Sequence, residues 1–111
     1  MNLKTMLMAA AGVAALVGPA HALDAAAAKA LAQKNACMGC HQVDKKLVGP
    51  SYKDVAAKYK GDKNAMANLS KKVKAGGAGV WGPVPMPANP NISDADLKTV
   101  LEWVLAGAPA K

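Results

Sequence analysis

The sequence contains one compact run of residues whose types and spacing can carry chemistry, Cys-Met-Gly-Cys-His at residues 37–41. Two cysteines three positions apart lie on the same side of a helical turn. Cys37 and Cys40 can therefore each form a thioether with one vinyl group of a haem, and Cys-x-x-Cys-His is the attachment sequence for a covalent c-type haem. His41 would then lie under the iron, where an imidazole nitrogen is a good axial ligand.

The N-terminal 22 residues have the features of a secretory signal. Lys4 supplies the positive start, residues 5–20 are uncharged and rich in Ala, Leu, Val and Met, and Ala-His-Ala at 20–22 fits the small-x-small cleavage rule. The uncharged run is short for a membrane span, which needs about 20 strongly apolar residues. We therefore expect cleavage of residues 1–22, one domain at residues 23–111, and a periplasmic protein without stable membrane insertion; the alternative is that residues 1–22 stay as an uncleaved anchor.

The Cys-x-x-Cys spacing has two other uses, disulfide exchange and zinc binding. An oxidising compartment favours a disulfide between Cys37 and Cys40. A thioredoxin-like pair, however, normally lies within a βαβ pattern, and no strand-like alternation follows here. Zinc is less favoured, because adjacent residues such as Cys40 and His41 coordinate one tetrahedral ion poorly. The sequence favours haem over both alternatives.

A haem iron with histidine on one face needs a ligand on the other. His21 is lost with the signal, which leaves three methionines as candidates. Met38 lies between the two cysteines and cannot reach the far face, and Met66 lies on a helical apolar stripe, where packing is the expected role. Met86 lies in Gly-Pro-Val-Pro-Met-Pro at 82–87, whose prolines lower the entropy lost when the segment is ordered. We predict Met86 as the second axial ligand; the alternative is that it only fills a gap in the packing.

Helical spacing of apolar residues, together with capping residues, predicts an all-α fold. We expect helices at residues 24–35, 51–59, 62–75 and 93–106, separated by loops that include 42–50 and 76–92. The second of these loops is rich in Gly and Pro and too long for a plain connector, which is typical of a functional loop.

The side chains available for a core are few and small. The sequence has no Phe, two Trp and two Tyr, and much of its 52% hydrophobic fraction is alanine. A domain of this size is only marginally stable unaided. A haem would supply the missing apolar body, so we expect the apo-protein to be largely unfolded. Because the sequence has no second Cys-x-x-Cys-His run, we expect one haem per chain.

Further motifs follow the Cys-x-x-Cys-His run in order. They are Val-Gly-Pro at 48–50, Tyr-Lys-Asp-Val-Ala-Ala-Lys at 52–58, Val-Trp-Gly-Pro-Val-Pro-Met-Pro at 80–87 and Trp-Val-Leu at 103–105. The combination resembles the small bacterial class I cytochromes c of the c-551/c-552 type, over about residues 24–106. The resemblance implies their fold, with about four helices wrapped around one covalently bound haem.

The resemblance also implies roles for single residues. Cys37 and Cys40 would hold the haem, with His41 and Met86 as its axial ligands. The carbonyl of Pro50 would accept a hydrogen bond from the other ring nitrogen of His41, which fixes the imidazole and raises its basicity.

Three more residues match family positions, and two depart from them. The resemblance implies that Trp81 donates its indole N–H to a haem propionate, that Asn89 contacts the sulfur of the axial methionine, and that Trp103 lies where the terminal helices pack. Lys72 stands where the family often has an arginine near a propionate, and lysine gives a point charge rather than a bidentate fork. Ala88 stands where a further proline is common.

The charge of the chain suggests its partners. All 14 basic residues are lysines, and loss of Lys4 with the signal leaves 13 against seven acidic residues, a net charge of +6 before haem. Lysines cluster at 45–46, 58–63 and 71–74. These clusters are either solvated helix faces or a positive rim around the haem edge that steers acidic redox proteins. Such complexes are transient and weaken as salt rises. We expect a monomer and no nucleic-acid partner.

These expectations describe an electron carrier rather than an enzyme. With both axial positions filled, no site remains for oxygen or peroxide, and His/Met ligation raises the reduction potential. We expect one-electron transfer from a membrane quinol-oxidising complex or a small redox protein to a terminal reductase or oxidase. The alternative is a haem enzyme or gas-binding protein with an open distal site. The loop prolines and the lack of a distal His or Arg argue against it.

Overall fold

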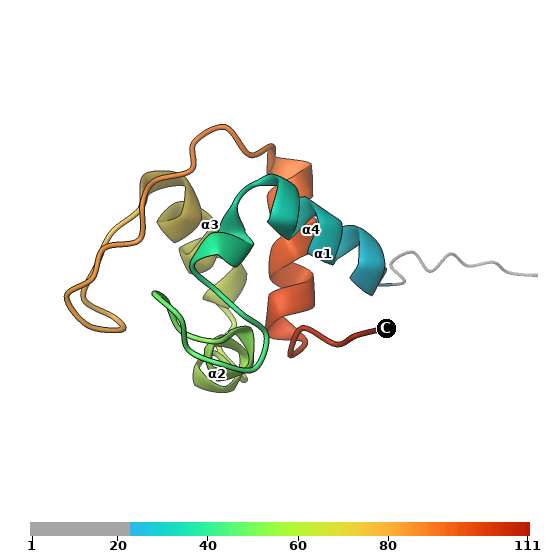
Figure 1. Cartoon of the computed structure of the whole chain (residues 1–111), viewed down its shortest axis with the longest axis horizontal. Coiled ribbons are helices and arrows are strands. Elements are labelled where there is room, and N and C mark those ends of the chain that lie inside the picture. Colours follow the sequence, from blue (N-terminus) through green and yellow to red (C-terminus); the bar gives the residue numbers. More distant parts are fainter. Residues whose placement is uncertain (1–22) are drawn as a thin grey trace, which may run out of the picture.

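The computed structural model describes residues 23–111, so the expected signal at residues 1–22 lies outside the described residues. The described part is all-helical, as predicted, and Figure 1 shows α4 running between α1 and α3, with α2 at one end. Its elements are α1 (Ala25–Lys34), the 3-10 turn η1 (Cys37–Gly39), α2 (Tyr52–Lys58), α3 (Ala65–Ala75) and α4 (Asp94–Leu105). None of the helices in this part of the chain combines the length and apolar character needed to span a lipid bilayer.

Three helices begin at the capping residues that the sequence indicated. Asp24, Ser51 and Ser93 each accept a hydrogen bond from the backbone N–H three residues further on, over 3.0, 3.0 and 3.1 Å. Each cap satisfies one of the N–H groups that a first helical turn leaves unpaired. A cap of this kind contributes about 1 kcal/mol to helix stability, which explains why these three boundaries were predicted within one residue.

The predicted start of the third helix was wrong. α3 begins at Ala65 rather than at Asp62. Asp62 Oδ1 accepts a hydrogen bond from the Asn64 backbone N–H at 2.8 Å, which forms a local turn instead of a helix cap. Short polar side chains can bond nearby backbone in this way in non-helical conformations, and here that alternative prevails.

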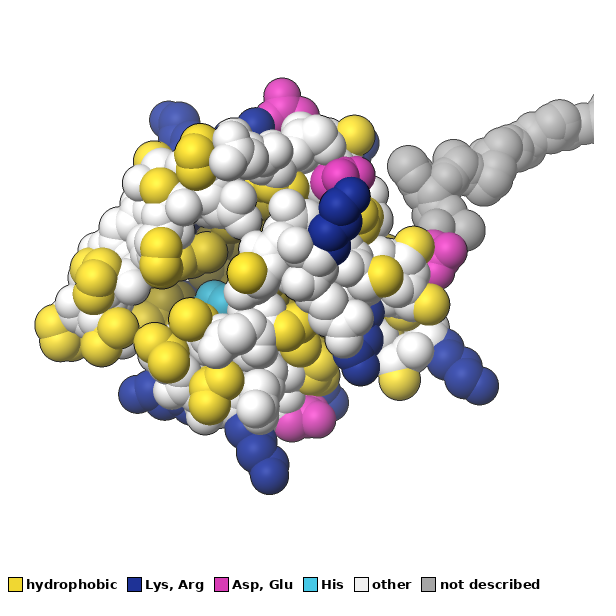
Figure 2. Space-filling model, turned by 45° about the horizontal axis from the view of Figure 1, so that its top comes forward, with side chains coloured by type: hydrophobic (Ala, Val, Ile, Leu, Met, Phe, Trp, Pro, Cys, Tyr) yellow, Lys and Arg dark blue, Asp and Glu magenta, His cyan; other side chains and the backbone are white. Residues whose placement is uncertain are grey.

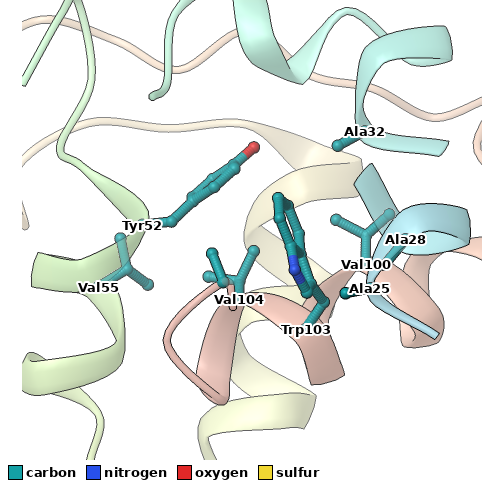
Figure 3. Close-up of a cluster of buried hydrophobic side chains, with 9 residues drawn as sticks. Ala25, Ala28, Ala32, Tyr52, Val55, Val100, Trp103 and Val104 are labelled. Atoms are coloured by element: carbon teal, nitrogen blue, oxygen red, sulfur yellow. The ribbon is translucent and has the colours of Figure 1, made fainter. Parts of the chain in front are cut away.

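The main core lies where α1 crosses α4. Ala25, Ala28 and Ala32 share one buried face of α1, and their short side chains leave room for Trp103 of α4 (Figure 3). Trp103 is 1% exposed, and its indole N–H donates to the carbonyl of Pro109 at 2.9 Å. The polar atom of this buried ring is therefore satisfied. The expected position of Trp103 between the terminal helices is confirmed.

A second core cluster joins α3 to α4. Its buried members are Ile92, Leu97 and Leu101, and Met66, Leu69 and Val73 pack against them. Met66 therefore takes the packing role that its place on the helical stripe predicted. Lys74 and Asp94 link the same two helices at the surface, with Nζ and Oδ1 2.5 Å apart.

We expect the Lys74–Asp94 pair to give a small stability contribution that depends on pH. The hydrogen bond and charge of Lys74 hold the pKa of the Asp94 carboxyl below its usual range. A lowered folded pKa adds stability above the unfolded value, about 3.9 for aspartate, and this contribution is lost as the pH falls through the folded pKa. Lys74→Gln should therefore lower the free energy of unfolding in urea at pH 6 and have less effect near pH 3. The effect should be small because the pair is exposed.

Lys71→Gln is the matched control for this measurement. It removes the same charge from α3 without breaking an ion pair of the described residues. An equal loss in both variants at pH 6 would show that the Lys74–Asp94 contact contributes nothing of its own.

Candidate functional site

A cavity of about 300 Å³ opens between α2, α3, α4 and the segment at 77–87. Its lining is mainly apolar, and Figure 2 shows a hollow with hydrophobic side chains around its mouth and histidine inside it. Seven of the eight predicted site residues line the cavity, and Asn89 does not. The seven are Cys37, Cys40, His41, Pro50, Lys72, Trp81 and Met86.

His41 is held in one orientation by the residues before α2. Its Nδ1 lies 2.8 Å from the carbonyl oxygen of Pro50. A carbonyl can only accept, so Nδ1 carries a proton, and in the neutral imidazole Nε2 then has the free lone pair. Gly49 lies against the ring so closely that a Cβ there would be 2.6 Å from His41 Cε1. The ring is thus fixed with one unprotonated nitrogen available for a metal.

Tyr52 supports His41 from α2. The two rings stack with centroids 5.1 Å apart and planes 20° apart, and the Tyr52 ring meets the Trp103 ring edge-on at 5.6 Å. His41 is therefore packed against the core of α4 through one intervening ring. Burial, with the neighbouring Cys37, raises the pKa of the Tyr52 hydroxyl, which stays protonated at neutral pH.

Cys37 is the first residue of the η1 turn, and Cys40 comes directly after it. The backbone N–H groups of Cys40 and His41 both donate to the Cys37 carbonyl, at 3.2 and 3.0 Å. The two thiols are not bonded to each other. Burial raises the pKa of the Cys37 thiol, although its hydrogen bond with Tyr52 acts in the opposite direction. Reactive exchange thiols have lowered pKa values, so this environment does not favour thiol chemistry. Within residues 23–111, no three His, Cys, Asp or Glu side chains gather closely enough to hold a metal ion.

Met86 is placed by its backbone. The N–H of Gly77 donates to the Met86 carbonyl at 3.0 Å, and the N–H of Met86 donates to the Gly77 carbonyl at 2.8 Å. Further along, Gly79 N–H donates to the Gly82 carbonyl at 2.9 Å. Residues 77–86 therefore form a narrow double-stranded excursion, and Met86 lies at its base beside the cavity.

Gly76 allows this close pairing. Its φ of 74° and ψ of −173° lie in a region essentially restricted to glycine, and a Cβ there would be 2.6 Å from the Met86 carbonyl oxygen. We expect Gly76→Ala to lower the free energy of unfolding by about 1–3 kcal/mol from the backbone conformation alone, and by more from the clash. Urea unfolding of the haem-bound protein would measure this difference.

Gly61→Ala is the matched control, because Gly61 also has a positive φ, 79°, but no neighbouring heavy atom within 4 Å of an added Cβ. A loss for Gly76→Ala no larger than that for Gly61→Ala would contradict the importance of the Gly76 contact with the methionine backbone.

Comparison with known proteins identifies the group to which this site belongs. The family model for cytochrome c matches residues 25–108, a range that spans all four helices, the Cys-x-x-Cys-His run and Met86. The chain belongs to the cytochrome c family. It is a class I monohaem cytochrome c of the c-551/c-552 type, as the order of its motifs implied, with one covalently attached haem per chain. It is an electron carrier and not an enzyme.

Its relatives cover most of the described chain. It is 53% identical to cytochrome c-552 of Nitrosomonas europaea over 75 aligned residues. The alignment covers 68% of this chain and 73% of that protein. It is 49% identical to cytochrome c-551 of Pseudomonas aeruginosa over 76 residues, 68% and 72% of the two chains. The crystal structure of the N. europaea protein matches with a TM-score of 0.68 at 51% identity, over 71% of this chain and 98% of that one.

The cavity of this cytochrome fits a haem. Its lining is mainly apolar, Cys37 and Cys40 are both part of that lining, and the tautomer of the neutral His41 ring leaves Nε2 free to bind a metal. The thioether of Met86 is a neutral donor that lines the same cavity. Imidazole, thiol and thioether are the side chains with which c-type cytochromes hold their cofactor.

The other predicted site residues lie around this cavity or near it. Trp81 is 43% exposed at the cavity mouth. The Lys72 side chain extends over Gly77, because a Cβ added to Gly77 would lie 3.3 Å from the Nζ of Lys72. Asn89 instead fastens the chain after Met86, since its Nδ2 donates to the Asn35 carbonyl at 3.1 Å.

Sequence reasoning missed four supporting residues of the site. Gly76 and Gly77 were predicted only as the start of the loop at 76–92, but Gly77 pairs with Met86 and Gly76 lies against the Met86 carbonyl. Gly49 and Tyr52 were seen only as parts of family motifs, but they pack on His41. The available signal for Gly76 and Gly77 was that two consecutive glycines stand where one is enough to end a helix. The sequence held no local signal for Gly49 and Tyr52.

Proposed function

We propose that this cytochrome carries single electrons in the periplasm through a haem held by Cys37 and Cys40, with His41 and Met86 as axial ligands. The hydrogen bond from His41 Nδ1 to the Pro50 carbonyl is the observation that carries the proposal. In the neutral imidazole it leaves the lone pair of Nε2 free for a metal, and His41 and Met86 line the same cavity.

The residues around the ligands set their chemistry. Pro50 raises the basicity of the imidazole through its hydrogen bond, and Gly49 and Tyr52 keep the ring from turning. The haem supplies a reversible ferrous–ferric couple. Two neutral ligands and an apolar lining disfavour the extra positive charge of the ferric state and so raise the reduction potential. With His41 and Met86 both engaged, oxygen and peroxide find no open position.

Three polar side chains complete the proposed site. Trp81 and Lys72 both line the cavity, and we assign the indole N–H and the ammonium as donors to the haem propionates. An amide nitrogen carries two hydrogens. Asn89 uses one for the Asn35 carbonyl, and we assign the other to the sulfur of Met86.

The partners are acidic redox proteins that meet the cavity mouth. Apolar side chains are exposed there, namely Val48, Val80, Trp81 and Val84, and Lys46 and Lys72 also line the cavity. An apolar contact within a positive rim suits a brief, salt-sensitive encounter. The donor would be a membrane quinol-oxidising complex or a small redox protein, and the acceptor a terminal reductase or oxidase. The carrier would act as a monomer after removal of residues 1–22 on export.

A potentiometric titration of the purified holoprotein, followed by optical spectroscopy, tests the ligand assignment. We expect one reversible one-electron step and a near-infrared sulfur-to-iron band in the ferric state. High-spin ferric iron without that band would reject Met86 as ligand and favour a haem enzyme or gas-binding protein with an open distal site. Electron-transfer rates with acidic partner proteins should fall as ionic strength rises, and rates independent of salt would reject the lysine rim.

A further inference from the structure

Lys58, the last residue of α2, makes a contact that the proposed site does not use. Its Nζ lies 5.5 Å from the centroid of the Trp81 ring, within the range of a cation–π interaction. Lys58 takes part in no ion pair of the described residues 23–111. Its ammonium is therefore directed to the indole face rather than to a carboxylate.

This contact joins two parts of the cavity that are distant in sequence. α2 follows the segment that holds His41, whereas Trp81 lies between Gly79 and Gly82 in the turn of the 77–86 excursion that carries Met86. The Lys58–Trp81 contact therefore connects α2, on the His41 side of the cavity mouth, with the 77–86 excursion, on the Met86 side.

Contacts within the polypeptide restrain the tip of the excursion at few other points. Its base is closed by the two hydrogen bonds between Gly77 and Met86, and its turn by the one from Gly79 to Gly82. Val80 and Val84 on either side of the tip are 48% and 60% exposed. Segments with few buried contacts open locally at low free-energy cost, so a single contact at the tip has a measurable effect on opening.

We propose that Lys58 is a positioning residue that holds Trp81, and with it the 77–86 excursion, closed over the cavity mouth, and so slows the release of Met86 from the iron. The part that concerns Met86 rests on the proposed function. An exposed cation–π contact changes a local opening equilibrium by about two- to fivefold. The excursion should open more often by that factor when the contact is removed.

The experiment compares three variants of the holoprotein. Lys58→Gln removes the cation, Lys58→Arg keeps it on a side chain that also stacks on aromatic faces, and Lys60→Gln removes the same charge from a nearby exposed lysine that makes no cation–π contact or ion pair among the described residues. Amide hydrogen exchange at Gly77, Gly79 and Met86 reports opening of the excursion. The rate at which added imidazole binds the ferric iron reports release of Met86.

We expect exchange and imidazole binding to be two- to fivefold faster in Lys58→Gln, and unchanged in Lys58→Arg and Lys60→Gln. In a Trp81→Leu background, Lys58→Gln should have no further effect. Equal changes in Lys58→Gln and Lys60→Gln would overturn the proposal in favour of a general charge effect, and unchanged exchange in Lys58→Gln would also overturn it.

Failure of the proposed function would look different. The unsubstituted ferric protein would then lack the sulfur-to-iron band before any imidazole is added. That result would overturn the effect on Met86 release, whereas amide exchange at Gly79 would still decide whether Lys58 closes the excursion.

Discussion

Replacing Met86 by alanine is expected to turn the ferric protein from low spin to high spin and to abolish the sulfur-to-iron absorption band. Alanine offers no donor atom, so the distal position would be left to water or to added ligands. The reduction potential should fall by roughly 100 mV or more, because axial ligands set haem potentials over a range of ~0.8 V and methionine lies toward its upper end. Optical spectra and a redox titration of the variant measure both effects.

Met66→Leu is the matched control for this substitution. Met66 packs against the cluster of Ile92, Leu97 and Leu101 between α3 and α4, and leucine keeps nearly the same volume. Exchanges of this kind cost less than about 1.5 kcal/mol. The band should survive in Met66→Leu; its loss there, with retention in Met86→Ala, would reverse the assignment of the two methionines.

The parts of this fold that were predicted correctly are those with local causes. Asp24, Ser51 and Ser93 begin helices because each side chain bonds a backbone N–H only three residues away. The position of Trp103, by contrast, was implied by the resemblance to the c-551/c-552 cytochromes, and the structure buries this residue between α1 and α4. The predicted helix start at Asp62 was wrong because the Asp62 carboxylate accepts a local hydrogen bond from the Asn64 N–H. Helix propensity alone could not show whether residues 62–64 form a first helical turn or the local turn that the structure contains.

The parts that could not be predicted depend on contacts between distant backbone segments. Gly77 and Met86 pair across a turn whose course is set by several positive φ values, and no periodic pattern marks such a pairing. The stacking of Tyr52 on His41 likewise depends on how the loop at 42–50 folds back, for which the Tyr52 N–H donates to the Gln42 carbonyl at 2.9 Å. The sequence therefore indicated which residues could hold a cofactor, but not what keeps them in place.

Replacing both Cys37 and Cys40 by alanine is expected to yield a protein without covalent haem that is largely unfolded. The buried core is small, and three of its members are alanines of α1. An empty cavity of about 300 Å³ would lower stability by about 7 kcal/mol, at ~24 cal/mol per Å³, if it were fully closed to water. This is an upper value, because the mouth admits water. It is still comparable with the whole stability of a typical domain, about 5–15 kcal/mol. The free energy of unfolding of the haem-free polypeptide should therefore be close to zero.

Far-UV circular dichroism and thermal melting of the exported double variant test this expectation against the wild-type holoprotein, with mass spectrometry to establish haem content. We expect most helical signal and the cooperative melting transition to be lost. A haem-free variant with wild-type helicity and a cooperative transition would contradict it, because the packing of Trp103 against α1 would then stabilise the fold without the cofactor. The cysteine thioethers would in that case fix the haem in a preformed cavity, instead of completing the core of the domain.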